Sequence, residues 1–147
     1  MFDQQLALKR IEEVKSKKLT RLDLSSCDLR KLPYELSELI WIEELNLNNC
    51  KYIHDFSLIE SLINLKTLVL GGIKRVYLNI GFIEKLPNLE SIDLRESTVR
   101  DWTPLKYALK LKTLDVSFTE IENLSPLEGL TQLEDISFMY GYESSKY

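Results

Sequence analysis

The chain has 147 residues, of which 44% are hydrophobic and 29% are charged, and its net charge at pH 7 is −4. These values suit one globular unit with a continuous core, so we expect a single domain over residues 1–147. They exclude a membrane-spanning chain, because no segment approaches the roughly 18 uninterrupted apolar residues that a spanning helix needs.

The first predicted element is a helix within residues 1–18, which we interpret as an N-terminal cap over the core. Asp3 is a candidate N-cap, and apolar residues recur behind it at a roughly helical spacing at Leu6, Leu8, Ile11 and Val14. The alternative is a helix lying on a membrane surface through its lysines, which Glu12 and Glu13 disfavour because they interrupt the basic face. The N-terminus lacks the apolar run of a secretory signal. We therefore expect a cytoplasmic protein, and an exported effector is the alternative.

Behind this helix one apolar pattern recurs six times. Each copy has apolar residues at its first, fourth and sixth positions, and the copies begin near residues 19, 42, 65, 89, 111 and 133. Alternating apolar and polar residues predict a short strand with its polar side chains facing outward. A single copy cannot bury its own apolar side, so the copies must stack. The pattern predicts six parallel strands.

The period and the leucine positions resemble those of leucine-rich repeat proteins over the whole chain. The first repeat resembles the general bacterial and plant-like form, whereas residues 99–105 and 121–127 of the fourth and fifth resemble the 22-residue form of internalins. The resemblance implies an α/β solenoid, a short right-handed horseshoe with its strands on the concave face and short helical or 3-10 turns on an irregular convex side. Two convex rows are expected to face the core: Leu29, Leu32, Leu36 and Leu39, and Ile121, Leu124, Leu127 and Leu130.

At the far end only a tail of residues 141–147 follows the sixth strand. Terminal repeats normally carry a polar cap, and this tail is too short for one. We therefore expect the strand at about 134–140 to keep an unpaired edge, through which two copies of the chain could form a homodimer. The alternative is that Tyr142 and Tyr147 fold back over the end.

The resemblance also implies recognition of a protein partner through the concave face. On this face Asp93 and Asp115 are predicted cross-strand neighbours, and Arg95 is their obvious partner. These residues form either an acidic patch for a basic partner surface or a solvated face of the sheet. The last two turns place Phe118, Met139 and Tyr140 together on the concave rim, and exposed aromatic residues and methionines are frequent at interfaces.

Two further positions interrupt the pattern. Trp41 stands where the other turns have polar residues, so it is either exposed for a partner or lies on the cap helix. The pair Gly71 and Gly72 predicts either the close approach of another backbone or a bend. Trp102, by contrast, occupies a leucine position and is predicted to lie in the core.

The sequence favours no catalytic site and no cofactor. Cys27 and Cys50 occupy equivalent positions and are expected to be buried free thiols, close enough for a disulfide in an oxidising compartment. No third cysteine or nearby histidine suggests zinc, and His54 has no recognisable partners for a triad. Nucleic acid is also excluded, because the predicted concave sheet is neutral to acidic.

The sequence therefore predicts a non-enzymatic interaction module, of bacterial type, that binds a protein partner through its concave sheet and C-terminal aromatic rim. The alternatives are an inhibitor or immunity-type protein that masks a partner enzyme, and a bacterial effector.

Overall fold

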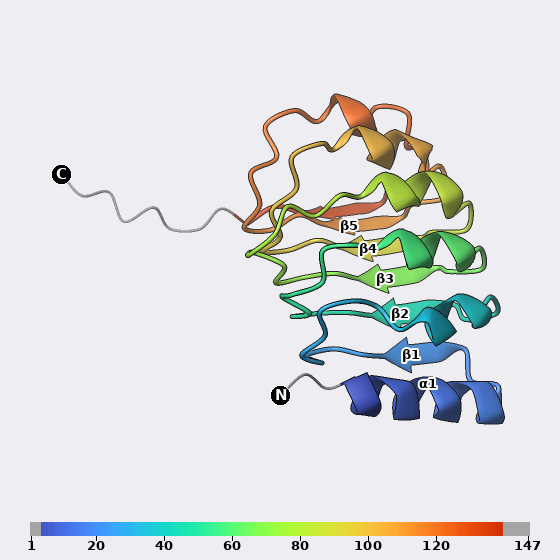
Figure 1. Ribbon diagram of the computed structural model, residues 1–147. Helices are drawn as coiled ribbons and strands as arrows, with labels where there is room; N and C mark the ends of the chain where they lie inside the picture. The colour runs from blue at the N-terminus through green and yellow to red at the C-terminus, as the bar shows by residue number, and fades with distance from the viewer. Residues whose placement is uncertain (1–3, 140–147) are drawn as a thin grey trace.

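The computed structural model describes residues 4–139 and is an open solenoid (Figure 1). One α-helix is followed by six strands that pair in parallel, in chain order, in a single sheet. The elements are α1 (Gln4–Lys17), β1 (Arg21–Asp23), η1 (Tyr34–Glu38), β2 (Glu44–Asn46), η2 (Ser57–Ser61), β3 (Thr67–Val69), η3 (Gly81–Lys85), β4 (Ser91–Asp93), η4 (Thr103–Tyr107), β5 (Thr113–Asp115), η5 (Ser125–Leu127) and β6 (Asp135–Ser137). This is the predicted leucine-rich repeat architecture.

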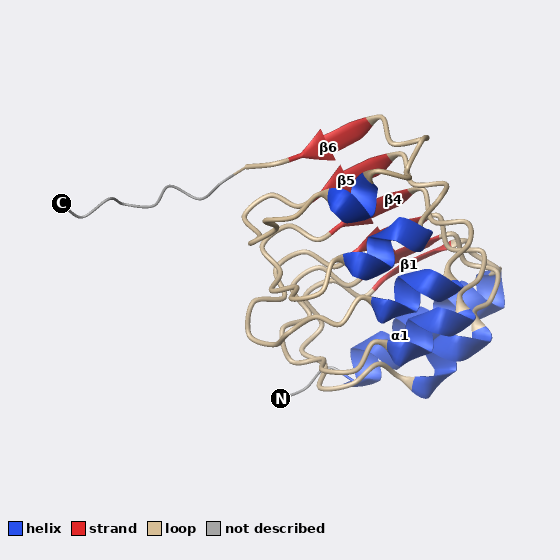
Figure 2. Cartoon of the chain, turned by 90° about the horizontal axis from the view of Figure 1, so that it is seen from above, coloured by secondary structure: helices blue, strands red, loops and turns tan. Residues whose placement is uncertain are grey.

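The strand register follows the fourth position of each repeat. In the register Leu45 pairs with Leu68, and Leu68 pairs with Ile92, so apolar side chains stack along the inner face. The chain must cross over the core between successive parallel strands. It does so through the five 3-10 turns, and Figure 2 shows these blue turns on the opposite side of the molecule from the red strands.

Short polar side chains start most of these 3-10 turns. The Asp55 carboxylate accepts the backbone N–H of Ser57 at 2.9 Å, and Asn79, Asp101 and Asn123 accept the N–H two residues on in the same way. Asp and Asn favour such local hydrogen bonds over continued regular structure. The predicted irregular convex side with 3-10 turns is confirmed.

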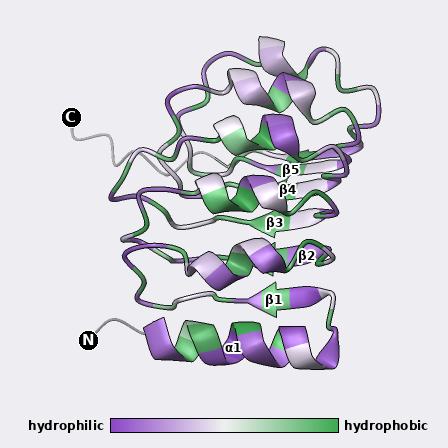
Figure 3. Cartoon of the chain, turned by 45° about the vertical axis from the view of Figure 1, so that its right-hand side comes forward, coloured by the Kyte–Doolittle hydropathy of each residue, from purple (hydrophilic) through white to green (hydrophobic). Residues whose placement is uncertain are grey.

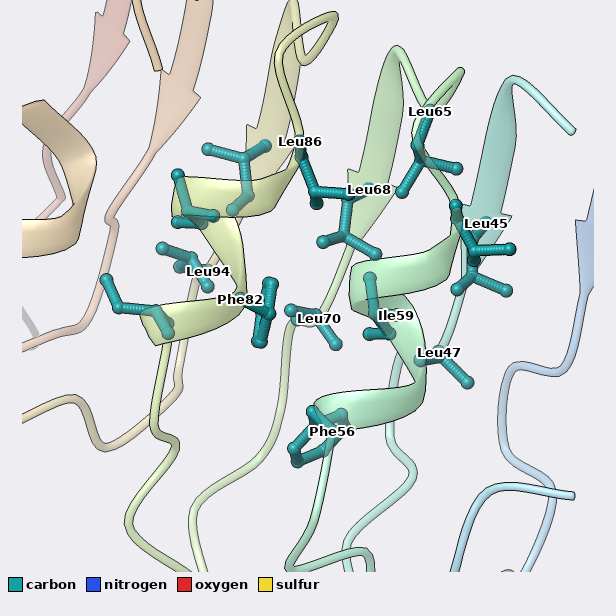
Figure 4. Close-up of a cluster of buried hydrophobic side chains, with 14 of the residues drawn as sticks. Leu45, Leu47, Phe56, Ile59, Leu65, Leu68, Leu70, Phe82, Leu86 and Leu94 are labelled. Carbon is teal, nitrogen blue, oxygen red and sulfur yellow. The ribbon is translucent and has the colours of Figure 1, made fainter. Parts of the chain in front are cut away.

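The core lies between the sheet and the 3-10 turns and runs the length of the solenoid. Figure 4 shows leucines of the sheet meeting Phe56, Ile59, Phe82 and Leu86 of the convex side. The rings of Phe56 and Phe82 lie 6.5 Å apart between centroids and join two successive turns. Leu65, Leu68 and Leu70 are fully buried. The first convex row and Trp102 are buried as predicted.

Helix α1 covers the N-terminal end of this core, and hydrophobic and hydrophilic residues alternate along it (Figure 3). Its buried residues are Ala7, Ile11 and Val14, which recur at intervals of four and three and so share one helix face. The prediction that Leu6 belongs to this face is wrong, because Leu6 is 41% exposed and Ala7 takes its place.

The C-terminal end is less well covered. Leu124 is 47% exposed and Phe138 is 39% exposed, whereas their equivalents in the central turns are buried. The prediction that Leu124 faces the core is therefore wrong, because β6 is the last strand of the sheet and no described element lies beyond it. β6 has one strand neighbour among the described residues. Dimerisation through this edge stays a prediction.

Candidate functional site

The concave sheet presents three columns of outward side chains, one residue from each turn in each column. Asp23 and Asn46 in the middle column lie beside each other in the register, and the column continues through Val69, Asp93, Asp115 and Ser137. Within a column, hydrogen bonds can join side chains of neighbouring strands. The Thr113 hydroxyl, for example, donates to the Ser91 hydroxyl at 2.6 Å. The outward positions are therefore regularly spaced and hold mostly small or polar groups.

Asp93 and Asp115 are paired in the register, as predicted, and Arg95 joins them. Its Nη2 lies 2.6 Å from Asp93 Oδ2, and its Nε lies 3.5 Å from Asp115 Oδ2. The hydrogen bond to Asp93 and the charges of both carboxylates raise the pKa of the Arg95 guanidinium. One cation thus compensates two like charges that would otherwise repel across the strands. The predicted acidic patch carries only one net negative charge here.

A charge ladder follows the second position of the second to sixth repeats, at the edge where the chain enters the strands. Its signs alternate from turn to turn through Glu43, Lys66, Glu90, Lys112 and Glu134. Lys66 lies 2.9 Å from Glu43, and Lys112 lies 2.8 Å from Glu90. The hydrogen bond from Lys112 lowers the pKa of the Glu90 carboxyl, and the hydrogen bond to Glu90 raises that of the Lys112 ammonium. The ladder neutralises itself and offers little net charge to a partner.

One residue after each of the strands β1 to β5 adopts the left-handed backbone conformation. This column consists of Ser26, Asn49, Gly72, Glu96 and Phe118, with φ between 55° and 78°. Gly72 has the largest φ, and a Cβ built on it would lie 2.4 Å from Asn49 Oδ1 of the preceding turn. Of the two interpretations of the glycine pair, a sharp bend is the one observed, and asparagine side chains fill the space beside it.

Phe118 and Met139 lie on neighbouring turns at the concave rim, as predicted. The backbone N–H of Phe118 donates to the carbonyl of Met139 at 2.6 Å. Their side chains are 45% and 61% exposed. Phe118 is the aromatic member of the left-handed column, a conformation that bulky residues rarely adopt. Tyr140, the third predicted residue of this patch, lies outside the described residues.

Trp41 packs half-buried against the core beside the end of the cap helix. Its indole N–H donates to the carbonyl of Leu19 at 3.0 Å, and Lys18 Nζ lies 3.9 Å from the ring centroid. The equivalent Asn64 donates in the same way to Ile40 of the preceding turn, at 2.8 Å. Trp41 therefore ties two turns together as its polar equivalents do, and a contact with a partner through its exposed part stays a prediction.

Both cysteines are buried thiols. Cys50 Sγ donates to the carbonyl of Leu24 at 3.2 Å, and the Arg10 guanidinium donates to Cys27 Sγ at 3.7 Å. Burial is the main cause that raises the pKa of the Cys50 thiol from 9.0 to about 12, and the neighbouring Cys27 is the second. The thiolate is the reactive species, so Cys50 is held in an unreactive form.

We expect Cys50 to resist thiol reagents in the folded protein. In a Cys27→Ser variant at pH 8, Ellman's reagent should react at least ~100-fold more slowly in buffer than in guanidinium chloride, because burial suppresses the thiolate and blocks access. The same raised pKa means that stability contributed by the neutral thiol is present below pH 9.0 and is lost as the pH rises toward about 12. Equal reaction rates in buffer and denaturant would contradict this environment.

His54 is exposed on a loop, as expected, and lines a shallow hollow of about 410 Å³ with Asp28, Arg30 and Tyr52. Within residues 4–139 no three His, Cys, Asp or Glu side chains are placed to hold a metal ion. Over the same range, no helix combines the length and apolar character required to cross a membrane.

Sequence reasoning missed two exposed groups. Ile40, Ile63 and Leu109, each two residues before a repeat begins, are 49% to 62% exposed at the edge where the chain enters the strands. The loops of the second to fourth turns carry Tyr52 beside Arg75 and Tyr77 beside Arg100. The exposed apolar residues share one position in the repeat, so comparing that position between turns would have identified them. The tyrosine and arginine pairs were missed because the second and third turns have irregular lengths.

Comparisons with known proteins point to the same architecture. A family model described as a leucine-rich repeat matches residues 15–31. No curated protein matches the chain. A leucine-rich repeat protein of Leptospira interrogans superposes with a TM-score of 0.74 at 22% identity, covering 92% of this chain and 34% of that one. The functional domain of InlJ from Listeria monocytogenes superposes with a TM-score of 0.59 at 18% identity, covering 76% of this chain and 23% of that one. The chain thus spans about a third or less of the length of these two structures, and at these identities the likeness shows the fold.

Proposed function

We propose that this chain, a leucine-rich repeat protein, binds a protein partner through its concave sheet and the rim formed by Phe118 and Met139. Solenoids of this kind use the extended concave surface, built from one outward residue in each column of each turn, for binding. On this sheet Asp93, Asp115 and Arg95 supply a fixed polar cluster next to the rim. Trp41 contributes its exposed part at the other end of the sheet, and Tyr140, which lies outside the described residues, is a further predicted contact.

The observation that carries the proposal is the backbone of Phe118. A left-handed φ of 58° costs a non-glycine residue about 1 to 2 kcal/mol. Ser26, Asn49, Gly72 and Glu96 occupy this position in earlier turns, so the fold does not require an aromatic residue there. An aromatic ring that is 45% exposed in such a place carries a conformational cost, and contact with a partner accounts for that cost.

Replacing the two rim residues should weaken binding without unfolding the protein. For Phe118→Asn combined with Met139→Ser, we expect partner affinity to fall at least ~10-fold, because exposed aromatic anchors dominate interface energies. Asn suits the left-handed conformation, as Asn49 does, and the relieved strain offsets the lost ring contacts. Stability should therefore stay within about 1 kcal/mol of the wild type.

The measurement is quantitative affinity capture from lysate of the source organism, followed by titration of the purified partner. The matched control is Tyr107→Asn combined with Leu109→Ser, because these side chains are 47% and 62% exposed on η4 and the turn after it, away from the rim. The proposal requires loss of the partner with the rim variant and retention with the control. Equal capture by both variants, or loss with the control alone, contradicts it.

A further inference from the structure

A second surface lies on the loops that leave the carboxyl ends of the first four strands, on the left of the solenoid in Figure 1. We call it the loop face, and its exposed cations are Arg30, Lys31, Lys51, Lys74, Arg75 and Arg100. The chain as a whole has 23 acidic and only 19 basic residues. The loop face therefore concentrates positive charge on an otherwise acidic protein.

Two arginines of the loop face are held by tyrosine rings. The guanidinium carbon of Arg100 lies 3.2 Å from the Tyr77 ring centroid, and that of Arg75 lies 5.8 Å from the Tyr52 ring centroid. Neither arginine forms an ion pair with any residue in 4–139. A ring-bound guanidinium keeps its planar N–H edge available for a carboxylate and loses less side-chain entropy when it binds one.

Two acids of the same loops are engaged in holding the backbone. Asp55 and Asp101 accept the N–H groups of Ser57 and Thr103, each at 2.9 Å. The hydrogen bonds from Thr103 lower the pKa of the Asp101 carboxyl, so it stays ionised in this role. Lys74 differs from the two arginines, since its Nζ lies 2.5 Å from Glu96. Arg75 and Arg100 are thus the cations best placed to meet an outside anion.

The loop face is also hollowed. The depression of about 410 Å³ between Asp28, Arg30, Tyr52 and His54 joins the first turn to the second. Tyr52, which lines it, is 39% exposed, and Tyr77 of the next loop is 58% exposed. Exposed aromatic surface next to fixed cations suits a chain that carries carboxylates with apolar atoms between them.

We propose that the loop face binds an acidic peptide segment of a protein, with carboxylates of the segment bound by Arg75 and Arg100. The loop face borders the concave rim, where Lys74 and Phe118 line one depression, but the proposal does not depend on the function proposed for the concave face. A nucleic acid is the weaker fit, since its phosphates are continuous and would meet Asp28, Asp55 and Asp101. A peptide can place its charges at the arginines and neutral residues at the aspartates.

The test uses fluorescence polarisation with a labelled octapeptide of alternating glutamate and serine, at low salt. The variant is Arg75→Ala combined with Arg100→Ala, and the control, Arg21→Ala combined with Lys85→Ala, removes the same charge from exposed positions elsewhere. We expect the double variant to lose about 10-fold or more in affinity and the control to stay within about twofold. Changing both arginines to lysine should recover only part of the loss, because lysine lacks the planar fork.

Thermal unfolding of each variant establishes that it is folded. The proposal is overturned if the wild type does not bind the peptide, if the control loses as much affinity as the variant, or if a labelled oligothymidylate binds more tightly than the peptide. A matched lysine and serine octapeptide that bound equally well would overturn it too. Weakening of the wild-type complex on addition of salt supports it.

Discussion

Leu65→Ala should lower the free energy of unfolding by about 3 to 4 kcal/mol, the largest effect that we expect from a single substitution. Leu65 opens the third repeat and is fully buried between turns. Truncation removes apolar atoms from a packed site and leaves a cavity that the neighbouring turns cannot fill. Urea denaturation followed by circular dichroism measures the loss.

The repeat supplies its own controls at the same position. Leu19 opens the first repeat and is 41% exposed, whereas Leu133 opens the last and is half-buried. Their alanine variants should each cost about 1 to 2 kcal/mol, because part of each side chain already meets water. Three equal losses would show that position in the repeat, and not burial, determines the energy, which is contrary to this description of the core.

Gly72→Ala should cost about 2 to 3 kcal/mol, although it adds a single methyl group. The backbone at Gly72 has a φ of +78°, and the new Cβ would lie 2.4 Å from Asn49 Oδ1. The substitution therefore combines left-handed strain with displacement of a packed side chain. Gly129→Ala is the matched control, because its Cβ would have no atom within 4 Å, and it should leave stability unchanged or raise it by up to about 1 kcal/mol.

A double-mutant cycle separates the two causes. Asn49→Gly removes the side chain that the new methyl group would strike and still tolerates the left-handed backbone at that position. In the Asn49→Gly background, Gly72→Ala should cost about 1 kcal/mol less than in the wild type, and the remaining cost is backbone strain. If the two substitutions were additive, steric contact between them would have no part in the effect.

The sequence was sufficient for the solenoid because its signal is repeated. Each of the six turns places apolar residues at the same three positions. The pattern of any one turn is therefore predicted by the other five turns. The errors fall where this redundancy ends. Leu6 was assigned to the buried face from a loose helical spacing. Leu124 was assigned to the core as a member of a repeated convex row, although no described turn lies beyond it to cover it.

The candidate site could be predicted only as far as the strands extend. The pairing of Asp93 with Asp115 and the approach of Arg95 follow from strand register. The stacking of Arg100 on Tyr77 does not, because it joins loops of unequal length whose relative position depends on packing. The left-handed backbone of Phe118 is also invisible to hydrophobic patterning, since it is set by the turn that follows the strand.

The charge ladder at the strand-entry edge bears on how the repeats find their correct neighbours during folding. Their leucine positions are nearly interchangeable, so a chain that skipped one turn would still bury a similar apolar face. In that misaligned state Glu43 would lie beside Glu90, and Lys66 beside Lys112. Exposed ion pairs such as these add at most about 1 kcal/mol to native stability. Because the signs alternate, a pairing that skips one turn brings like charges together and is repulsive, although the leucines alone would permit it. The alternation therefore favours assembly of each turn on the one that precedes it.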